Sequence, residues 1–313
     1  MERANECKCH RLAISVNKTL SCDYFEAKFR KAVQCVTQEE NDKISRFRYK
    51  DDSLTALLGR LFLRQATRRL ANVKWSGIEF GRTEKGKPYV IKPEGVKFGI
   101  NVSHQGDYVA FASSCTSKVG VDCMRLDTER GSKSADDYIN SMAKSASAEE
   151  LRMMRAQPTE QTKMAYFYRY WCLKEAILKV ILDVVETVYK ILADADRSAT
   201  GDGLLSDLRR LDFRVNQTER YRQRCFINST TVLFDGKLQD QWTFEESFID
   251  DRHVCRENIV PASCIFCEHP DTRIFFATVN IDFLLEEATV INPIEMDAIS
   301  EWENFNLKPR KTF

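Results

Sequence analysis

Residues 168–181 read YRYWCLKEAILKVI, and this stretch anchors the interpretation of the whole chain. It has high helix propensity, and at about 100° per residue Trp171, Glu175 and Lys179 fall on one side of the helix. The opposite side carries apolar residues and is expected to pack on a core: Leu173, Ile177 and Val180. A surface pair spaced i,i+4 would explain the two charges and would stabilise the helix by ~0.3–0.5 kcal/mol. The neighbouring aromatic residues suggest, as the other interpretation, that the carboxylate is partly shielded from water.

The composition is that of a globular protein with one large or two moderate domains. The chain has 313 residues, of which 43% are hydrophobic. Its 47 Lys and Arg residues against 46 Asp and Glu residues leave a net charge of +1, so we expect no nucleic acid and no membrane as a partner. No export signal and no apolar window of about 18 residues is visible. We therefore expect a cytoplasmic protein, located in the cytosol, whose 11 cysteines are reduced thiols.

Two groups of cysteines have spacings that suggest a metal site. Residues 7–10 read CKCH, and residues 264–267 read CIFC with His269 nearby. Each group has too few ligands for a closed tetrahedral site. We expect ordinary thiols, with a metal site as the alternative.

The order of the elements predicts an α+β fold. Residues 37–71 are expected to be helical, because Thr37 and Glu40 form a capping box ahead of an apolar stripe. Short strands are expected at 78–80, 89–91, 100–102, 108–112, 118–122 and 231–234, and helices between 134 and 181. A turn is expected at Asp235-Gly236. Since strands and helices do not alternate with a regular βαβ period, a doubly wound parallel sheet is disfavoured. The polar segment from Val290 onward is expected to be loosely held.

Two carboxylates are candidate metal ligands. Asp122 is predicted to end a strand, where side chains face a site more often than a core, and Glu175 lies on the helix described above. Carboxylate oxygens suit Mg²⁺, with waters and substrate phosphates completing its shell. A turn or N-cap role is the alternative for the aspartate.

Two further stretches suggest a site for phosphates. The turn at 81–88, GRTEKGKP, holds Arg82, Lys85 and Lys87 near glycines whose N–H groups can face an anion; a solvated basic loop is the alternative. Residues 101–104, NVSH, place Ser103 and His104 at a strand end, although a structural histidine is common there. Together these features indicate phosphoryl transfer, in which catalysis is mostly positioning and charge neutralisation. The motifs of P-loop and kinase folds are missing.

Four runs resemble, in order and spacing, the motifs of the 4′-phosphopantetheinyl transferases. They are GRTEKGKPY at 81–89, FGINVSHQGDYVAFA at 98–112, VGVDCMRLD at 119–127 and FYRYWCLKEAILKVI at 167–181. The resemblance is to the large monomeric surfactin-synthetase type, and within it to the animal subgroup. It implies Mg²⁺-dependent transfer of the phosphopantetheine arm from coenzyme A to a serine of an apo carrier protein, with release of adenosine 3′,5′-bisphosphate.

The resemblance also implies roles for individual residues. Asp122 and Glu175 would bind Mg²⁺, and Glu175, directly or through a water, would take the proton of the carrier serine. Lys179 and His104 would neutralise phosphate oxygens, which makes Glu175, Lys179 and His104 the catalytic residues. The residues implied to bind coenzyme A are Lys43, Arg82, Thr83, Glu84, Lys85, Gly86, Lys87, Asn101, Val102, Ser103, His104, Glu175 and Lys179.

The fold that the resemblance implies has two pseudo-symmetric α+β halves with coenzyme A in the cleft between them. We place the halves at residues 1–115 and 116–285, followed by a tail at 286–313. The implied carrier partners are a fatty-acid synthase carrier domain, a mitochondrial carrier protein and aminoadipate-reductase-type domains. The chain is expected to be a monomer.

The sequence departs from the family pattern at two places. The residue two after the metal aspartate is Met124 where many relatives have an acid, so a water or Gln105 is the candidate third ligand. Residues 182–200 separate the motif helix from the glycine-rich run GDGL at 201–204 that the family has directly after it. This insert would prolong the helix, form a tolerated loop, or reflect an error in the gene structure.

Two other functions remain open at the level of the sequence. A prolonged helix would leave a catalytically impaired homologue that binds coenzyme A or carrier domains, because an active site tolerates misplacement of only ~1 Å. An unrelated Mg²⁺-dependent phosphoesterase using Asp122, Glu175 and Lys179 is the third reading, although the four ordered motifs disfavour it.

Overall fold

The chain folds into two compact units, each with its own hydrophobic core. The structure is a computed structural model that describes residues 8–83, 86–116, 119–126, 133–192, 207–217, 226–249, 259–265, 276–292 and 295–311. For 181–192, 259–265 and 295–297 it describes the backbone alone. The first unit comprises Met1–Ser117 and Ala277–Phe313, and the second comprises Lys118–Phe276.

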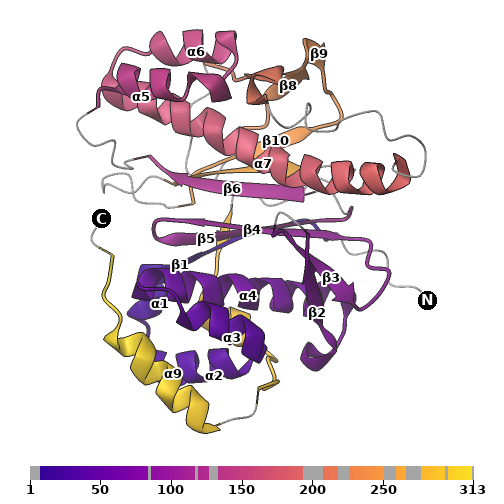
Figure 1. The fold of residues 1–313 in the computed structure, drawn as a ribbon, viewed down its shortest axis with the longest axis vertical. Coiled ribbons are helices and arrows are strands. Elements are labelled where there is room, and N and C mark those ends of the chain that lie inside the picture. The colour runs from indigo at the N-terminus through magenta and orange to yellow at the C-terminus, as the bar shows by residue number, and fades with distance from the viewer. Residues whose placement is uncertain are drawn as a thin grey trace. The chain divides into compact units, whose positions relative to one another are not determined.

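The first unit contains a mixed four-stranded sheet with helices gathered on one face (Figure 1). The strand order is β12 (Ala277–Thr278), β1 (His10–Ser15), β5 (Tyr108–Ser114) and β4 (Gly99–Gln105). β1 runs parallel to β12 and antiparallel to β5. A separate hairpin consists of β2 (Glu79–Arg82) and β3 (Pro88–Lys92). The helices are α1 (Val16–Leu20), α2 (Phe25–Gln34), α3 (Gln38–Ser45), α4 (Lys50–Ala71), α8 (Ile281–Leu285) and α9 (Glu295–Leu307).

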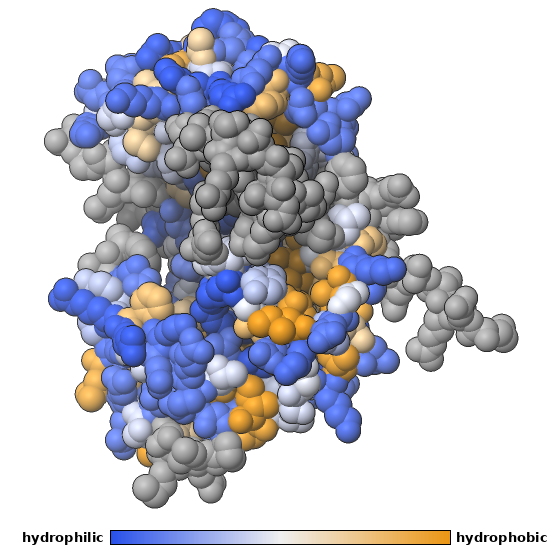
Figure 2. All heavy atoms as spheres, turned by 45° about the vertical axis from the view of Figure 1, so that its right-hand side comes forward, coloured by the Kyte–Doolittle hydropathy of each residue, from blue (hydrophilic) through white to orange (hydrophobic). Residues whose placement is uncertain are grey.

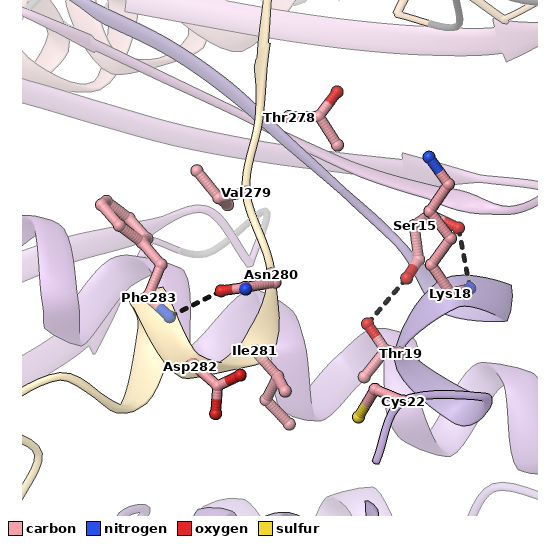
Figure 3. Close-up of a pocket in the computed structure, with 10 residues that line it drawn as sticks. All are labelled: Ser15, Lys18, Thr19, Cys22, Thr278, Val279, Asn280, Ile281, Asp282 and Phe283. Atoms are coloured by element: carbon pink, nitrogen blue, oxygen red, sulfur yellow. Dashed lines mark hydrogen bonds between the residues drawn. The ribbon is translucent and has the colours of Figure 1, made fainter.

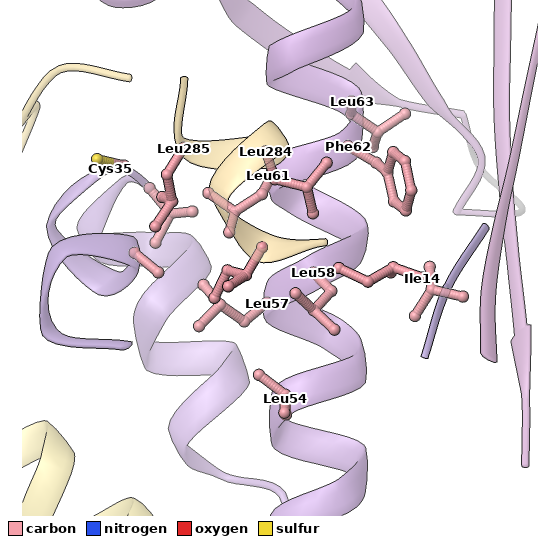
Figure 4. Close-up of a cluster of buried hydrophobic side chains, with 14 of the residues drawn as sticks. Ile14, Cys35, Leu54, Leu57, Leu58, Leu61, Phe62, Leu63, Leu284 and Leu285 are labelled. Carbon is pink, nitrogen blue, oxygen red and sulfur yellow. The ribbon is translucent and has the colours of Figure 1, made fainter. Parts of the chain in front are cut away.

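Helix α4 supplies the centre of the first core. Its buried leucines recur at the spacing of one helix face, and they meet Ile14 of β1, Cys35 and the leucines of α8 (Figure 4). The ring of Phe62 stacks on that of Phe111 in β5, with centroids 5.5 Å apart. This packing fixes α4 against the sheet that carries β4.

The helical region expected at 37–71 is two helices. The capping box is confirmed: the Thr37 side chain accepts from Glu40 N, and the Glu40 carboxylate accepts from Thr37 N. α3 then ends at Ser45, and α4 begins at Lys50. The hydroxyl of Ser53 donates to the carbonyl oxygen of Ile44 at 3.2 Å, which satisfies one of the terminal acceptors of α3.

The expectation that the segment from Val290 onward is loosely held is wrong. Residues 295–307 form α9, and Phe305 is buried with its ring centroid 4.3 Å from that of Phe29 in α2. Trp302 stacks on Phe305 as well. The apolar positions lie four and three residues apart, at Ala298, Trp302 and Phe305. The segment is polar in its overall composition, so the composition did not reveal this apolar stripe.

The second unit has a three-stranded antiparallel sheet, and its helices lie on one face of β6 (Figure 1). The strand order is β10 (Thr243–Glu246), β11 (Ile259–Ile265) and β6 (Val119–Arg125). A smaller sheet holds β7 (Leu211–Arg214), β8 (Thr231–Phe234) and β9 (Lys237–Leu238), and the expected turn at Asp235-Gly236 joins β8 to β9. The helices are α5 (Ala135–Ser141), α6 (Ala148–Arg155) and α7 (Glu160–Leu192). Both units mix helices with antiparallel strands, which confirms the α+β class.

Helix α7 is longer than the motif that it carries. It runs for 33 residues, so its helical backbone continues from Ile181 through the first part of the insert to Leu192. Of the three explanations for the insert, this favours a prolonged helix. Residues 193–200 and the glycine-rich run after them lie outside the described residues.

Among the coloured residues of the face shown in Figure 2, hydrophilic ones predominate and hydrophobic ones form smaller patches. Exposed large hydrophobic side chains are scattered over several elements, from Tyr24 to Leu307. Among the helices that the structure describes, none combines the length and the apolar character needed to cross a membrane.

Candidate active site

Strand β6 and helix α7 lie in backbone contact at Gly120. A Cβ atom placed on Gly120 would be 2.0 Å from the carbonyl oxygen of Ala176 and 2.9 Å from a methyl carbon of Val180. Only glycine permits this approach. This close contact brings the backbone of β6 against Ala176 and Val180 of α7, just after Glu175. It also sets the separation between the two elements that carry the predicted metal ligands.

Lys179 of α7 binds β6 directly. Its Nζ donates to Oδ1 of Asp122 at 2.7 Å and to the carbonyl oxygen of Val121 at 2.8 Å. The side chain of Lys179 is 25% exposed and that of Asp122 is 10% exposed, so the pair is shielded from bulk water on most sides. Partial burial strengthens such a charge-assisted bond.

Asp122 does not end its strand, contrary to the expectation from sequence. β6 continues to Arg125, because β11 pairs with it over its full length and places Ile259 opposite Arg125. Asp122 therefore lies in the middle of the ladder of hydrogen bonds that pairs β6 with β11. Its side chain is aimed by the pleat of the strand and by Lys179.

Glu175 lies one helical turn before Lys179 and is half-buried. Burial raises the pKa of its carboxyl group, the negative charge of Asp122 raises the pKa further, and the charge of Lys179 opposes both. Within the described part of the chain Glu175 has no ion-pair partner. Asp122, Glu175 and Lys179 thus form one electrostatic cluster, which is the group that the sequence predicted on these two elements.

The donor set of this cluster fits Mg²⁺. The described residues contain no group of three or more His, Cys, Asp or Glu side chains arranged to hold a metal ion. Two carboxylates that repel each other are nevertheless the chemistry that Mg²⁺ accepts, because this ion commonly takes one or two carboxylates and completes its shell with waters and substrate phosphates. Gln105, the candidate third ligand, ends β4 in the first unit, and its role as a ligand remains a prediction.

The residue before Glu175 has a structural role that the sequence did not reveal. Lys174 is 2% exposed, and its Nζ lies 2.9 Å from the carboxylate of Glu150, which is fully buried. The same Nζ donates to the carbonyl oxygens of Leu208 and Leu211. Burial lowers the pKa of Lys174 and raises that of Glu150, while their attraction opposes both shifts. The buried lysine therefore fixes the rotation of α7 next to Glu175.

The predicted phosphate-binding turn is the tip of the β2–β3 hairpin in the first unit. Arg82 donates to the carbonyl oxygen of Gly86 at 2.6 Å, and Gly86 has φ of +85°, a conformation that favours glycine. Thr83 accepts at its hydroxyl from the backbone N–H of Lys87. Glu84 and Lys85 lie outside the described residues.

Further cations lie near this hairpin. Lys43 of α3 forms an ion pair with Glu39 at 2.6 Å, and the pKa of Glu39 is lowered first by this hydrogen bond and also by the charge of Arg82. Arg82 and Lys43 thus act on the same carboxylate. Burial, and then the charge of Arg82, lowers the pKa of Arg60 on α4.

Two arginines of α4 near the hairpin were missed from sequence. Arg60 and Arg64 both approach the carboxylate of Glu40, at 3.7 and 3.0 Å. Their spacing of four residues was visible in the sequence. The sequence around Glu40 did not indicate that this capping-box residue would also form ion pairs with α4.

The residues of β4 divide between the two faces of its sheet. Asn101 and Ser103 are buried, and by strand alternation they point to one face. Val102 lies on the other face, where its side chain reaches within 3.6 Å of the Cβ position of Gly59 in α4. His104 shares the face of Val102 and is exposed. The strand therefore does not present all four predicted residues to one site.

A pocket of about 480 Å³ lies in the first unit away from these residues. Figure 3 shows its lining from the end of β1 through α1 and from β12 to α8, including Lys18, Cys22 and Asn280. The Asn280 side chain accepts from Phe283 N, and the Thr19 hydroxyl donates to the Ser15 carbonyl oxygen (Figure 3). None of the predicted site residues lines this pocket.

The chain matches known proteins over most of its length. Residues 24–116 match the family described as 4′-phosphopantetheinyl transferase, N-terminal, and residues 118–256 match the 4′-phosphopantetheinyl transferase superfamily. The L-aminoadipate-semialdehyde dehydrogenase-phosphopantetheinyl transferase of Mus musculus is 31% identical over 225 residues, which are 71% of this chain and 66% of the mouse protein. The Xenopus laevis protein of the same name is 28% identical over 297 residues, or 92% of this chain and 89% of the relative.

A bacterial relative matches over a shorter segment. The 4′-phosphopantetheinyl transferase of Bacillus subtilis is 29% identical over 149 residues, which are 46% of this chain and 59% of the relative. The two family matches together cover well over half of the chain and include Asp122, Glu175 and Lys179. The resemblance to the animal subgroup is confirmed by the mouse and frog relatives. The chain belongs to the 4′-phosphopantetheinyl transferase superfamily.

Proposed function

We propose that the chain transfers the 4′-phosphopantetheine arm of coenzyme A to a serine hydroxyl of a carrier protein. Its family membership supports this reaction class. The observation that carries the proposal is the cluster on β6 and α7, in which Lys179 holds Asp122 beside a half-buried Glu175 whose pKa is raised. The family resemblance implies metal binding for Asp122 and Glu175, proton transfer for Glu175, and neutralisation of phosphate oxygens for Lys179.

We assign Asp122 and Glu175 as the ligands of Mg²⁺, which would supply charge neutralisation at the pyrophosphate of coenzyme A. Glu175 accepts the proton of the carrier serine in this proposal, directly or through a water. A raised pKa suits that role, because a carboxylate with a pKa nearer to the working pH is a stronger base than an ordinary one. Lys179 keeps Asp122 in place and places a positive charge near the reacting phosphate.

The first unit would bind the nucleotide part of coenzyme A. Lys43 and Arg82 act on the same carboxylate, so these two cations belong to one basic surface that would accept phosphates. Thr83, Gly86 and Lys87 would add the backbone and side-chain donors of the hairpin tip. For Glu84, Lys85, Asn101, Val102 and Ser103 the binding role, and for His104 the phosphate contact, remain proposals that rest on the family resemblance.

The acceptor is proposed to be a carrier domain of the kind found in an L-aminoadipate-semialdehyde dehydrogenase. The names of the mouse and frog relatives support this choice. A fatty-acid synthase carrier domain and a mitochondrial carrier protein are further proposed acceptors, and the chain would act on them as a monomer.

Mass spectrometry of an apo carrier domain tests the reaction. The carrier is incubated with the chain, coenzyme A and Mg²⁺, and a parallel reaction contains the Glu175→Ala variant. The proposal expects the carrier to gain the mass of one phosphopantetheine arm with the parent chain and to remain unchanged with the variant. No gain with any of the three carriers, from protein that is folded by circular dichroism, would contradict the proposal.

The unbroken course of α7 to Leu192 favours one alternative, an impaired homologue. A helix that continues past the motif carries the chain away from the point at which relatives enter the glycine-rich turn. Deletion of residues 182–200 tests this reading with the same carrier assay. A large gain in rate on deletion would show that the insert impairs catalysis, whereas an unchanged rate would show that it is tolerated.

A further inference from the structure

Two cysteines of the first unit meet at one end of its sheet. The Sγ atoms of Cys9 and Cys115 are 3.7 Å apart, although 106 positions separate the residues in the sequence. No disulfide joins them. Cys9 directly precedes β1 and Cys115 directly follows β5, so the antiparallel pairing of these two strands brings the thiols together.

Hydrogen bonds continue this pairing past the last registered residues, His10 and Ser113. The hydroxyl of Ser113 accepts from His10 N at 3.1 Å and donates to the carbonyl oxygen of Lys8 at 2.7 Å. The backbone N–H of Lys8 donates to Sγ of Cys115 at 3.2 Å. The two chain segments are therefore held together on either side of Cys9. These hydrogen bonds already keep the two thiols adjacent, so the backbone does not have to rearrange to bring them together.

The two thiols differ in exposure. Cys9 is buried, with 3% of its surface exposed, whereas Cys115 is half-buried and keeps part of its surface in contact with solvent. Thiol–disulfide exchange requires one accessible thiolate to attack an external disulfide and a second thiol nearby to complete the reaction. Cys115 suits the first role, and Cys9 suits the second.

We propose that Cys9 and Cys115 are a reversible modification site, at which the two cysteines form a disulfide with each other. The oxidant is a low-molecular-weight disulfide, such as oxidised glutathione. Cys115 loses its proton to solvent, and its sulfur attacks one sulfur of the oxidant. The oxidant's S–S bond breaks, one thiol leaves, and a mixed disulfide remains on Cys115. The deprotonated Cys9 sulfur then attacks Sγ of Cys115 and displaces the second thiol. The two cysteines lose two electrons, and the oxidant is reduced to two thiols.

The position of Cys115 gives this bond a structural consequence. Only Thr116 and Ser117 separate Cys115 from the boundary at which the second unit begins. Oxidation would therefore tie the segment that leaves the first unit to the start of β1. Because the bond closes a long loop, it restricts the unfolded chain, and the first unit is expected to unfold at a higher temperature when oxidised.

Peptide mapping of the full chain tests the proposal. Trypsin releases Cys9 in the tripeptide 9–11 and Cys115 in the peptide 98–118, and neither peptide contains a second cysteine. Reduced protein is treated with oxidised glutathione, the remaining thiols are alkylated, and the digest is analysed with and without dithiothreitol. We expect the two peptides to appear joined, with a mass lower by two hydrogen atoms than their sum, and to separate on reduction.

Cys22 provides the matched control. It is half-buried like Cys115, and no other described cysteine lies within hydrogen-bonding distance of it. The Cys22→Ser variant should form the cross-link as the parent chain does, and the Cys115→Ser variant should not. If Cys115→Ser fails to fold, Cys115→Ala takes its place, with circular dichroism as the check. A mixed disulfide that persists on Cys115, or a parent chain in which both cysteines are alkylated, would overturn the proposal.

Discussion

Lys179 and Asp122 are joined by a hydrogen bond of 2.7 Å between Nζ and Oδ1, and this bond connects helix α7 to the middle of strand β6. The same ammonium group binds the carbonyl oxygen of Val121, so its position is fixed by two acceptors on one strand. Glu175, one turn earlier on α7, experiences the negative charge of Asp122 and the positive charge of Lys179 together. The lysine is therefore both a tether for the strand and the local counter-charge of two carboxylates.

Replacement of this lysine tests its double role. Lys179→Met keeps the length of the side chain and removes its charge, so Asp122 loses the ammonium group that it binds and the reacting phosphate loses a positive charge. We expect the rate of carrier modification to fall by about 100-fold or more, the size typical of removing one preorganised charge from an active site. The measurement is the initial rate of arm transfer at saturating coenzyme A.

Lys163 provides the control for that substitution. It lies on the same helix and forms an ion pair with Asp136 at 2.6 Å, away from β6. Lys163→Met should leave the transfer rate within about twofold of the parent value, because its ion pair joins α7 to Asp136 on α5 and Lys163 is not among the charges that act on Glu175. If both variants lost the same fraction of the transfer rate, Lys179 would matter only for the stability of the helix.

Glu175 should make stability depend on pH in a direction opposite to that of an ordinary salt-bridged carboxylate. Its pKa in the folded chain lies above 4.5, the usual value for a glutamate, so the folded state binds the proton more tightly than the unfolded state does. Stability is then lost as the pH rises from 4.5 through the raised pKa. Glu175→Gln removes this cost and should raise the thermal midpoint at neutral pH, while it abolishes transfer.

Thermal unfolding of both forms across the pH range checks this expectation. The advantage of Glu175→Gln should be present above the raised pKa and should shrink below pH 4.5, where the parent glutamate is protonated in both states. A parent chain that is more stable than the variant at neutral pH would contradict the electrostatic account of this site.

The sequence was sufficient for the parts of the site that lie on single elements. Glu175 and Lys179 could be placed on one helix face from their spacing. The capping box at Thr37 could be predicted from the four consecutive residues 37–40 alone. Asp122 was placed at a strand end because the pairing of β6 with β11 depends on a partner far along the chain. Lys174 was missed for the same reason. From sequence alone Lys174 resembles a surface lysine. Its buried partners, Glu150 and the carbonyl groups near β7, are far from it in the sequence and are known only from the fold.

Lys174 should contribute more to stability than any surface lysine of α7. Lys174→Met would leave the carboxylate of Glu150 buried without its counter-charge and would remove the donor to two carbonyl oxygens. We expect the free energy of unfolding to fall by about 3–5 kcal/mol, as for other broken buried ion pairs. The double variant Lys174→Met/Glu150→Gln should lose less than the sum of the single losses. Urea denaturation measures all three, and strict additivity would argue against a direct pair.

Gly120 should be the most sensitive glycine of the described second unit. In Gly120→Ala the new methyl group would be 2.0 Å from the carbonyl oxygen of Ala176, which is a backbone atom and cannot rotate away. β6 and α7 would have to separate, so we expect a loss of about 1–3 kcal/mol in the free energy of unfolding, together with a longer distance between Asp122 and Lys179. Gly77→Ala is the matched control, since a Cβ there meets nothing within 4 Å. If transfer activity in Gly120→Ala falls no further than the loss of folded protein explains, the close contact matters only for stability. A fall beyond that loss would show that the contact sets the geometry of the two carboxylates.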